Sequence, residues 1–381
     1  MLTRIYNEHL TTCLSKTEYL MISMLLNLLQ NFKNVKLEKL AAVFPFPIVF
    51  ESRRKKLKRF LESQCLTIEA IWIPIISKWI ETEFEPKEVV YIAIDRTQWA
   101  MINILMVSLV VNNRAIPLYF ELIDHVGNSD LQYQKSILGR VFNFLSRYRV
   151  VVLGDREFCS VELARWLNKQ ENVYFCLRLK KSTYIQIEEE TWISLQNLGL
   201  LPGMSLYYQG VKVTKTKGFY PVNVVGKWKR QYRGMTAEEG WFLLTNLDTL
   251  EQAILAYQKR MGIEEMFRDF KLGGYNLEST KLSGHRLYSL ILLISLAYSQ
   301  STLAGRAIKT KGVSKYIGRT KEKHRSFRRH SDFYLGLSAP DWLLSCQLLA
   351  PESRALMRLS PHKFANYQQG LKAISLIQSV F

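Results

Sequence analysis

Two continuous apolar runs in the middle of the chain each end in an aspartate. Residues 89–94 read VVYIAI before Asp95, and residues 149–154 read RVVVLG before Asp155. Apolar runs without alternation are typical of strands that are buried on both faces of a parallel sheet. Ligands of such sheets bind outside the carboxyl ends of the strands. The pattern therefore places both aspartates where a functional site is expected.

The residues around these runs predict an α/β fold. In chain order, the patterns indicate strands at 101–111 and 116–123, helices at 131–147 and 160–169, and a strand at 173–179. Three meandering strands, a helix, and then strands that alternate with helices is the order of a ribonuclease-H-like core. Short strands separated by glycine-rich turns then fill residues 182–240, which predicts a β-rich insertion.

A third stretch, YQKRMGIEEMFRDFK at 257–271, has the apolar spacing of one amphipathic helix. At roughly 100° per residue, Tyr257, Arg260, Glu264 and Lys271 all lie within about 60° of one direction. Taken alone, Arg260 and Glu264 could simply form an i,i+4 ion pair. Glu265 points about 100° away from this face, so Glu264 is the predicted site acid.

Asp95, Asp155 and Glu264 together form a three-carboxylate set with the order and placement of a two-metal phosphoryl-transfer site. Because all of these ligands are hard carboxylate oxygens, the predicted metal is Mg²⁺ or Mn²⁺, as two ions. Tyr257, Arg260 and Lys271 are predicted to contact phosphates, since cations neutralise phosphate charge and a phenol donates a hydrogen bond.

The spacing Y-x2-R-x3-E-x6-K resembles the signature of the DDE transposases of the insertion-sequence-four group. The sequences IDRTQW at 94–99 and LGDREF at 153–158 resemble the other two acid motifs of that group. The resemblance covers about residues 85–296. It implies a ribonuclease-H-like fold with a β-rich insertion between the second and third acids. It also implies metal-dependent cleavage at the ends of an insertion sequence and strand transfer into target DNA by a cut-and-paste mechanism.

Trp241 begins the apolar run WFLLT that leads to the Glu264 helix. The resemblance implies that this tryptophan stacks on a base flipped out during cleavage, whereas the alternative is a core tryptophan on a buried strand. Within the insertion, lysines and arginines are interleaved with aromatic residues. This pattern is typical of nucleic-acid contact and equally of a half-buried sheet, so both interpretations remain open.

The segments on either side of the core read as helical. We predict three parts of the chain: a small helical DNA-binding module at residues 1–84, the catalytic core at residues 85–300, and a basic helical C-terminal segment at residues 301–381. Six of the seven residues at 53–59 are basic, and Arg53, Arg54, Lys55 and Lys56 are the predicted DNA contacts in this run. The alternative for such a run is a solvated helix face.

The overall charge favours an anionic polymer as the partner. The chain of 381 residues has a formal net charge of +19, which favours nucleic acid. Five scattered cysteines without CxxC spacing indicate neither a disulfide framework nor a zinc site and suit a reducing cytoplasm. The apolar run at 287–298 is too short to span a bilayer, so a buried core helix is expected and no membrane partner.

The resemblance adds a homodimer in the complex that pairs the two element ends, and a location on DNA in the bacterial cytoplasm, with the nucleoid. Two other functions remain open from the sequence. One is a metal-dependent nuclease of the same fold that cuts DNA without joining it. The other is an inactive DNA-binding derivative, which is disfavoured because no acid of the set is replaced.

Overall fold

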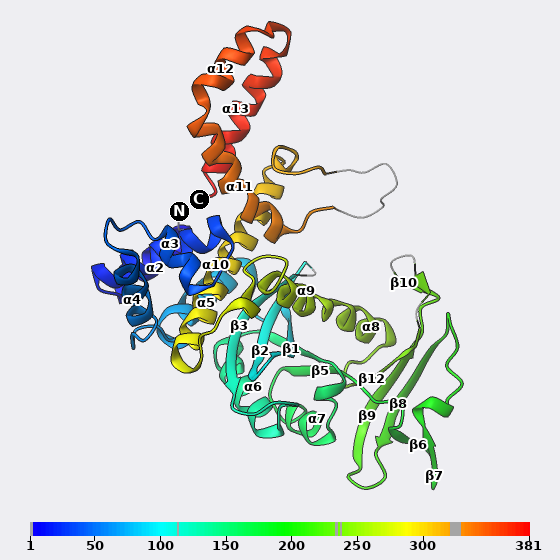
Figure 1. Cartoon of the computed structure of the whole chain (residues 1–381). Helices are drawn as coiled ribbons and strands as arrows, with labels where there is room; N and C mark the ends of the chain where they lie inside the picture. The colour runs from blue at the N-terminus through cyan, green and yellow to red at the C-terminus, as the bar shows by residue number, and fades with distance from the viewer. Residues whose placement is uncertain (1–2, 113, 233–234, 237, 321–328) are drawn as a thin grey trace. The chain divides into compact units, whose positions relative to one another are not determined.

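The computed structural model describes residues 3–112, 114–232, 235–236, 238–320 and 329–381 (Figure 1). The chain forms two compact units. One contains residues 80–268, and the other combines residues 1–79 with residues 269–381. Arg233 of the insertion and the basic residues at positions 321, 323, 325 and 328 of the predicted C-terminal segment lie outside the described residues.

In the described part of the unit of residues 80–268, ten strands form one mixed sheet. Its core strands are β1 (Val89–Trp99), β2 (Ile102–Val111), β3 (Arg114–Ile123), β4 (Arg149–Gly154), β5 (Val173–Arg178) and β12 (Trp241–Thr245). Strands β1, β2 and β3 form an antiparallel meander, while β4 runs parallel to both β1 and β5. The α/β class predicted from the sequence is therefore confirmed.

Helices cover both faces of this sheet (Figure 1). Helices α6 (Leu131–Leu145) and α7 (Val161–Leu167) lie on one side, and α8 (Leu250–Lys259) lies on the other. Continuous burial follows from this cover: every residue from Val150 to Gly154 in β4 is buried. This explains why the sequence shows an unbroken apolar run in place of an alternating one.

The strands of the insertion extend the same sheet. They are β6 (Tyr184–Glu188), β7 (Thr191–Ser194), β8 (Ser205–Val213) and β9 (Phe219–Lys227), with a separate two-stranded sheet of β10 (Gln231–Tyr232) and β11 (Met235–Thr236). The sheet order is β3-β2-β1-β4-β5-β12-β9-β8-β6-β7. Strand β12 joins the two parts, because it pairs with β5 on one side and with β9 on the other.

The stretch 257–271 is not one helix, which corrects the expectation from its periodicity. Helix α8 ends at Lys259, α9 spans Met261–Phe270, and Lys271 lies in the turn that follows. Arg260 stands at the junction, where its N–H donates to the Tyr257 carbonyl in a tighter i→i−3 turn. Gly262 follows at once. A Cβ there would lie only 3.1–3.3 Å from atoms of Val110, Arg114 and Ala115, so glycine favours the close approach of α9 to β2 and β3, and a larger residue would require these neighbours to shift.

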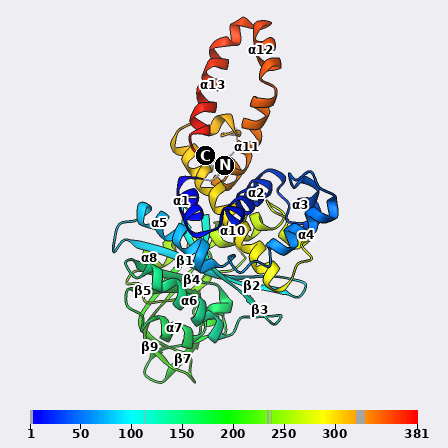
Figure 2. The same ribbon diagram turned by 90° about the vertical axis from the view of Figure 1, so that its left-hand side faces the viewer.

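The second unit is helical. Its elements are α1 (Arg4–Cys13), α2 (Lys16–Phe32), α3 (Leu37–Val43), α4 (Phe50–Phe60), α5 (Ile73–Glu83, of which 73–79 belong here), α10 (Gly284–Thr310), α11 (Asp332–Leu348), α12 (Ala350–Arg358) and α13 (Phe364–Gln378). Helix α10 packs against α2 and α11 (Figure 2). Among the described residues it is the one helix long and apolar enough to cross a membrane, yet 89% of its most apolar window is buried inside the structure. A mostly buried helix of this kind is typical of a protein core.

Helices α10 and α11 meet at a pair of glycines. A Cβ on Gly305 would lie 1.8 Å from the Asp332 carbonyl oxygen, and a Cβ on Gly336 would lie 1.8 Å from the Ser301 carbonyl oxygen. These separations are far below van der Waals contact, so the backbones can approach this closely only because neither residue has a side chain. In contrast, α12 has no buried residue, and α13 buries only Ala373 and Ile377.

Candidate active site

Asp95 lies within β1, not at its end as the apolar run suggested. Strand β1 continues to Trp99 because it pairs with β2 over this length, with Asp95 opposite Met106. The parallel pairing of β1 with β4, however, ends at Ile94 opposite Gly154. Asp95 and Asp155 are therefore the first residues beyond the parallel pairing on two neighbouring strands. This places both acids at the same edge of the sheet, as the sequence predicted.

The environment of Asp95 disfavours its charged form. Burial raises the pKa of its carboxyl group to about 7, and the nearby charges of Asp155 and Glu264 act in the same direction, while Arg260 opposes them. The side chain is only 15% exposed. Asp155 and Glu264 are therefore both close enough to affect the protonation of Asp95.

Arg260 joins the third acid to the first. Its guanidinium contacts Asp95 Oδ2 at 3.2 Å through Nη1, and its Nη2 donates to Glu264 on α9. The i,i+4 ion pair considered from the sequence is therefore present, but the same guanidinium also spans to β1. Glu265 faces other partners, because it pairs with Arg268 and lies 3.9 Å from Arg114. Glu264, and not Glu265, is therefore the acid that Arg260 links to Asp95.

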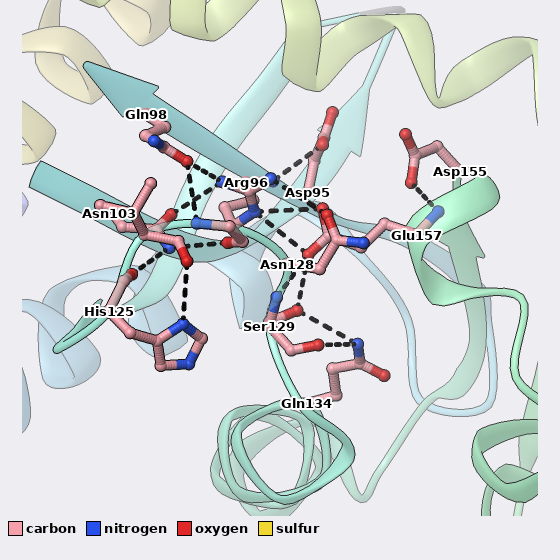
Figure 3. A network of polar contacts seen from close by, with 12 residues as sticks. Asp95, Arg96, Gln98, Asn103, His125, Asn128, Ser129, Gln134, Asp155 and Glu157 are labelled. Carbon is pink, nitrogen blue, oxygen red and sulfur yellow. Dashed lines mark hydrogen bonds and ion pairs between the residues drawn. The ribbon is translucent and has the colours of Figure 1, made fainter. Parts of the chain in front are cut away.

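A second ion pair fixes the two aspartate segments to each other (Figure 3). Arg96 follows Asp95 directly, and its Nε lies 3.0 Å from Glu157 Oε2. Glu157 in turn donates its backbone N–H to Asp155 Oδ1 at 2.8 Å, and the N–H of Arg96 donates to Asp95 Oδ1 at 2.7 Å. Arg96 and Glu157 therefore orient both acids, through the backbone and through their own salt bridge.

Polar side chains surround this ion pair on both sides (Figure 3). The Nη1 of Arg96 donates to Gln98 and Asn103, and Ser129 donates to Glu157 through both its N–H and its hydroxyl. This role of Arg96 and Glu157 was not predicted from the sequence. The signal was present in the motifs DR and DRE, where opposite charges directly follow Asp95 and Asp155.

Tyr257 and Trp241 lie together beside Arg260. The Tyr257 side chain is buried, and burial raises the pKa of its phenol to about 12. Its hydroxyl and the Nε of Arg260 are buried donors that make no hydrogen bond within the described part of the chain. Trp241 is half-buried at the start of β12, and its ring packs edge-on against Tyr257 at a centroid distance of 5.1 Å.

The other predicted DNA contacts belong to the helical unit, so the structure does not place them against the acids. Lys271 pairs with Glu278 at 2.7 Å. Helix α4 buries only Leu57 and leaves its basic side chains at least partly accessible. Arg54 pairs with Glu51 at 2.9 Å, and the Lys56 ammonium lies 5.0 Å from the centroid of the Phe46 ring. Arg53 reaches the Phe46 carbonyl at 3.4 Å, whereas Lys55 is exposed.

Carboxylate oxygens are the ligands that hard divalent cations prefer. Among the described residues, no group of three or more His, Cys, Asp or Glu side chains is close enough to hold one metal ion. The guanidinium of Arg260 contacts two of the three acids and supplies positive charge between them. Since the charges of Asp155 and Glu264 raise the pKa of Asp95, a cation held by these oxygens would relieve that repulsion.

We compared the chain with known proteins. No curated protein sequence matches it. Among solved structures, a piggyBac transposase synaptic complex with hairpin DNA is 13% identical, covers 89% of this chain and 77% of its own, and has a TM-score of 0.45. Argonaute of Marinitoga piezophila with guide RNA and target DNA is 13% identical and has a TM-score of 0.24, and the alignment covers 46% of this chain and 26% of the Argonaute chain. Both TM-scores are below 0.5, and we draw no conclusion from them.

The family comparison is more informative, because it covers β4 and α9, the elements beside Asp155 and around Glu264. The sequence-family description "Transposase DDE domain" matches residues 102–299, which is just over half of the 381 residues. The match includes Asp155 and Glu264 and begins immediately after β1, which carries Asp95. The chain therefore belongs to the transposase DDE domain family.

Proposed function

We propose that this chain is a cut-and-paste DNA transposase of the insertion-sequence-four group with a ribonuclease-H-like catalytic core. The observation that supports this best is the contact of Arg260 with both Asp95 and Glu264, which joins the first acid to the signature helix. The order of three antiparallel strands followed by parallel β4 and β5 supports the core assignment.

Asp95, Asp155 and Glu264 would hold the divalent ions of the reaction, with Mg²⁺ or Mn²⁺ favoured by the carboxylate oxygens. Two such ions, when bound, activate the attacking oxygen and stabilise the leaving oxygen of an in-line displacement. The first displacement would be hydrolysis at the element end, which leaves a 3′ hydroxyl. That hydroxyl would then attack a phosphodiester of target DNA and join the element to it.

The chain's own cations have a defined part in this reaction. Arg260 would exchange its carboxylate partners for a phosphate of the bound strand once the acids hold their ions. The buried hydroxyl of Tyr257 and the Nε of Arg260 lack acceptors in the described structure, and phosphate oxygens would supply them. Trp241 would stack on an extruded base, since its ring is half-buried beside Tyr257.

The remaining parts would bind and position DNA. Residues 1–84 would form a DNA-binding module that uses Arg53, Arg54, Lys55 and Lys56, and residues 85–300 would carry out the chemistry. Lys271 would add a phosphate contact, and the basic segment 301–381 would add non-specific affinity. We further propose that two copies pair the element ends, in the bacterial cytoplasm on the nucleoid.

The test of this proposal compares two adjacent glutamates. Glu264→Gln should abolish Mg²⁺-dependent cleavage of DNA that carries the element ends, while binding in EDTA persists, because only the metal-holding acid is lost. Glu265→Gln is the matched control and should still cleave, since Glu265 pairs with Arg268 and faces Arg114. Cleavage by Glu264→Gln at the wild-type rate would contradict the assignment, and cleavage without joining by the wild type would identify a nuclease.

A further inference from the structure

One carboxylate outside the three acids accepts from three cations. Glu239 Oε1 is contacted by Arg156 and, at 2.5 Å, by Arg178, while its Oε2 lies 2.9 Å from the Lys181 ammonium. The four side chains are 19–44% exposed, so a solvent-borne ligand can reach them. Three cations around one carboxylate leave two positive charges without a counter-charge in the group.

This cluster lies at the same edge of the sheet as the catalytic acids. Arg156 directly follows Asp155. Arg178 ends β5, one residue beyond the last parallel pair of Gly154 with Leu177. Burial lowers the pKa of Arg178, and repulsion from Arg156 and Arg260 lowers it further, while Tyr257 acts in the opposite direction. Arg178 is therefore close enough to Arg260 and Tyr257 to interact with both.

The cluster also contains an unused donor. The Nε of Arg156 is buried and makes no hydrogen bond within the described residues, although a terminal nitrogen of the same side chain reaches Glu239. A carboxylate has two oxygens and one negative charge. It therefore cannot neutralise three cations or accept all of their hydrogen bonds, whereas phosphodiester oxygens arranged along a strand offer more acceptors.

We propose that Arg156, Arg178 and Lys181 form a further binding subsite for a DNA backbone phosphate, and that Glu239 occupies this subsite in the free protein. The incoming phosphate displaces the Glu239 carboxylate. Glu239 therefore competes with DNA and lowers the affinity of the protein for DNA. The proposal rests on the proposed function, because it assumes that DNA crosses this edge of the sheet beside the acids.

The test measures binding of a fluorescently labelled double-stranded DNA oligonucleotide to the full chain in EDTA, where no cleavage occurs. Glu239→Gln should bind DNA more tightly than the wild type, by about fivefold or more beyond the control, since a competing anion is removed. The control is Glu162→Gln. Both substitutions remove one negative charge. Glu162 resembles Glu239 in its surroundings, because it also pairs with a cation, Lys217, and its side chain is 33% exposed against 31% for Glu239. Equal affinities for the two variants would overturn the proposal.

A second comparison tests the same subsite from the cation side. Arg156→Gln with Lys181→Gln should weaken binding and reduce the salt dependence by roughly one phosphate contact per cation. In that double variant, Glu239→Gln should no longer increase the affinity for DNA. A gain in affinity that persists there would show that Glu239 does not act through these cations. Competition predicts a gain in affinity that requires Arg156 and Lys181, whereas loss of a purely structural salt bridge predicts no gain that depends on these cations.

Thermal unfolding in inorganic phosphate, against chloride at equal ionic strength, tests the subsite without DNA. Phosphate should raise the Tm of Glu239→Gln more than that of Glu162→Gln, because only the former exposes the three cations. Equal shifts would contradict the proposal. Wild-type protein that fails to bind DNA would instead contradict the proposed function, and the phosphate experiment would still decide whether the subsite exists.

Discussion

At the scale of the residue, the two aspartates are oriented by groups that follow them in sequence. Arg96 and Glu157 are 15% and 12% exposed, and their ion pair is held on both sides by amide, hydroxyl and backbone groups. A buried charge pair of this kind is costly to break, because the remaining partner keeps its desolvation cost without its counter-charge. The pair therefore fixes the separation of the β1 and β4 acids.

Glu157→Gln should raise the Mg²⁺ concentration needed for half-maximal cleavage by roughly tenfold to a hundredfold, because groups that orient metal ligands have effects of this size. DNA binding in EDTA should stay unchanged. Cleavage rates measured over a range of Mg²⁺ concentrations provide the test. Glu121→Gln, at a half-buried acid that faces Arg140 at 3.8 Å, is the control. An unchanged Mg²⁺ dependence would show that the pair does not orient the acids.

The acids themselves could be predicted from sequence, because each has a strong local signal. Asp95 and Asp155 follow apolar runs, and Glu264 has a fixed spacing to Tyr257 and Arg260. The contact from Arg260 to Asp95 joins residues 165 positions apart and has no local signal. The cluster around Glu239 joins three segments, which carry Arg156, the pair Arg178 and Lys181, and Glu239, so only the folded sheet shows that they meet.

At the scale of the element, close backbone contacts decide where helices pack. Gly305 on α10 and Gly336 on α11 face each other's helix backbone, whereas Gly370 on α13 has no atom within 4 Å of where a Cβ would lie. Glycine inside a helix lowers stability relative to alanine unless close packing requires it. The three glycines should therefore respond differently to the same substitution.

Gly336→Ala should lower the free energy of unfolding by about 1–3 kcal/mol or more, because the added methyl group must push α10 and α11 apart. Gly370→Ala should instead raise it by roughly 0.5–1 kcal/mol, since the helix loses a flexible residue without a clash. Chemical denaturation of the two variants beside the wild type measures both effects. Similar changes in both variants would contradict the close α10–α11 crossing.

Element types followed from periodicity, but some boundaries did not. The pattern of residues 257–271 is helical throughout, and the interruption at Arg260 arises where Gly262 packs against β2 and β3. Strand β1 extends to Trp99 because β2 supplies hydrogen bonds for polar residues that would not form a strand alone. Contacts between segments that are distant in sequence determine where these elements end, and the pattern of a single sequence carries no information about such contacts.

At the scale of the whole molecule, the net charge of +19 sets the expected behaviour with DNA. Cations that neutralise phosphates release counterions, which makes the affinity fall with salt. Helix α4 concentrates this charge in the helical unit, and the cations around Glu239 concentrate it at the edge of the sheet. Binding should therefore draw on charges from both compact units.

DNA affinity should fall by about a hundredfold or more between roughly 50 and 200 mM salt, as expected for several phosphate contacts. Changing Arg53, Arg54, Lys55 and Lys56 to Gln should reduce the slope of log affinity against log salt concentration by the amount expected for the loss of several phosphate contacts. Fluorescence anisotropy titrations at a series of salt concentrations measure the slope. An unchanged slope in the α4 variant would remove this helix from the DNA interface.

The central claim is most directly tested by cleavage and joining of DNA fragments that carry the ends of the protein's own element. The purified wild type and Asp95→Ala would be assayed side by side, each with Mg²⁺ and with EDTA. We expect Mg²⁺-dependent cuts at the element ends followed by joining, and loss of both in Asp95→Ala. Cleavage and joining by Asp95→Ala at the wild-type level, or by the wild type in EDTA, would contradict a metal-dependent site built on this aspartate.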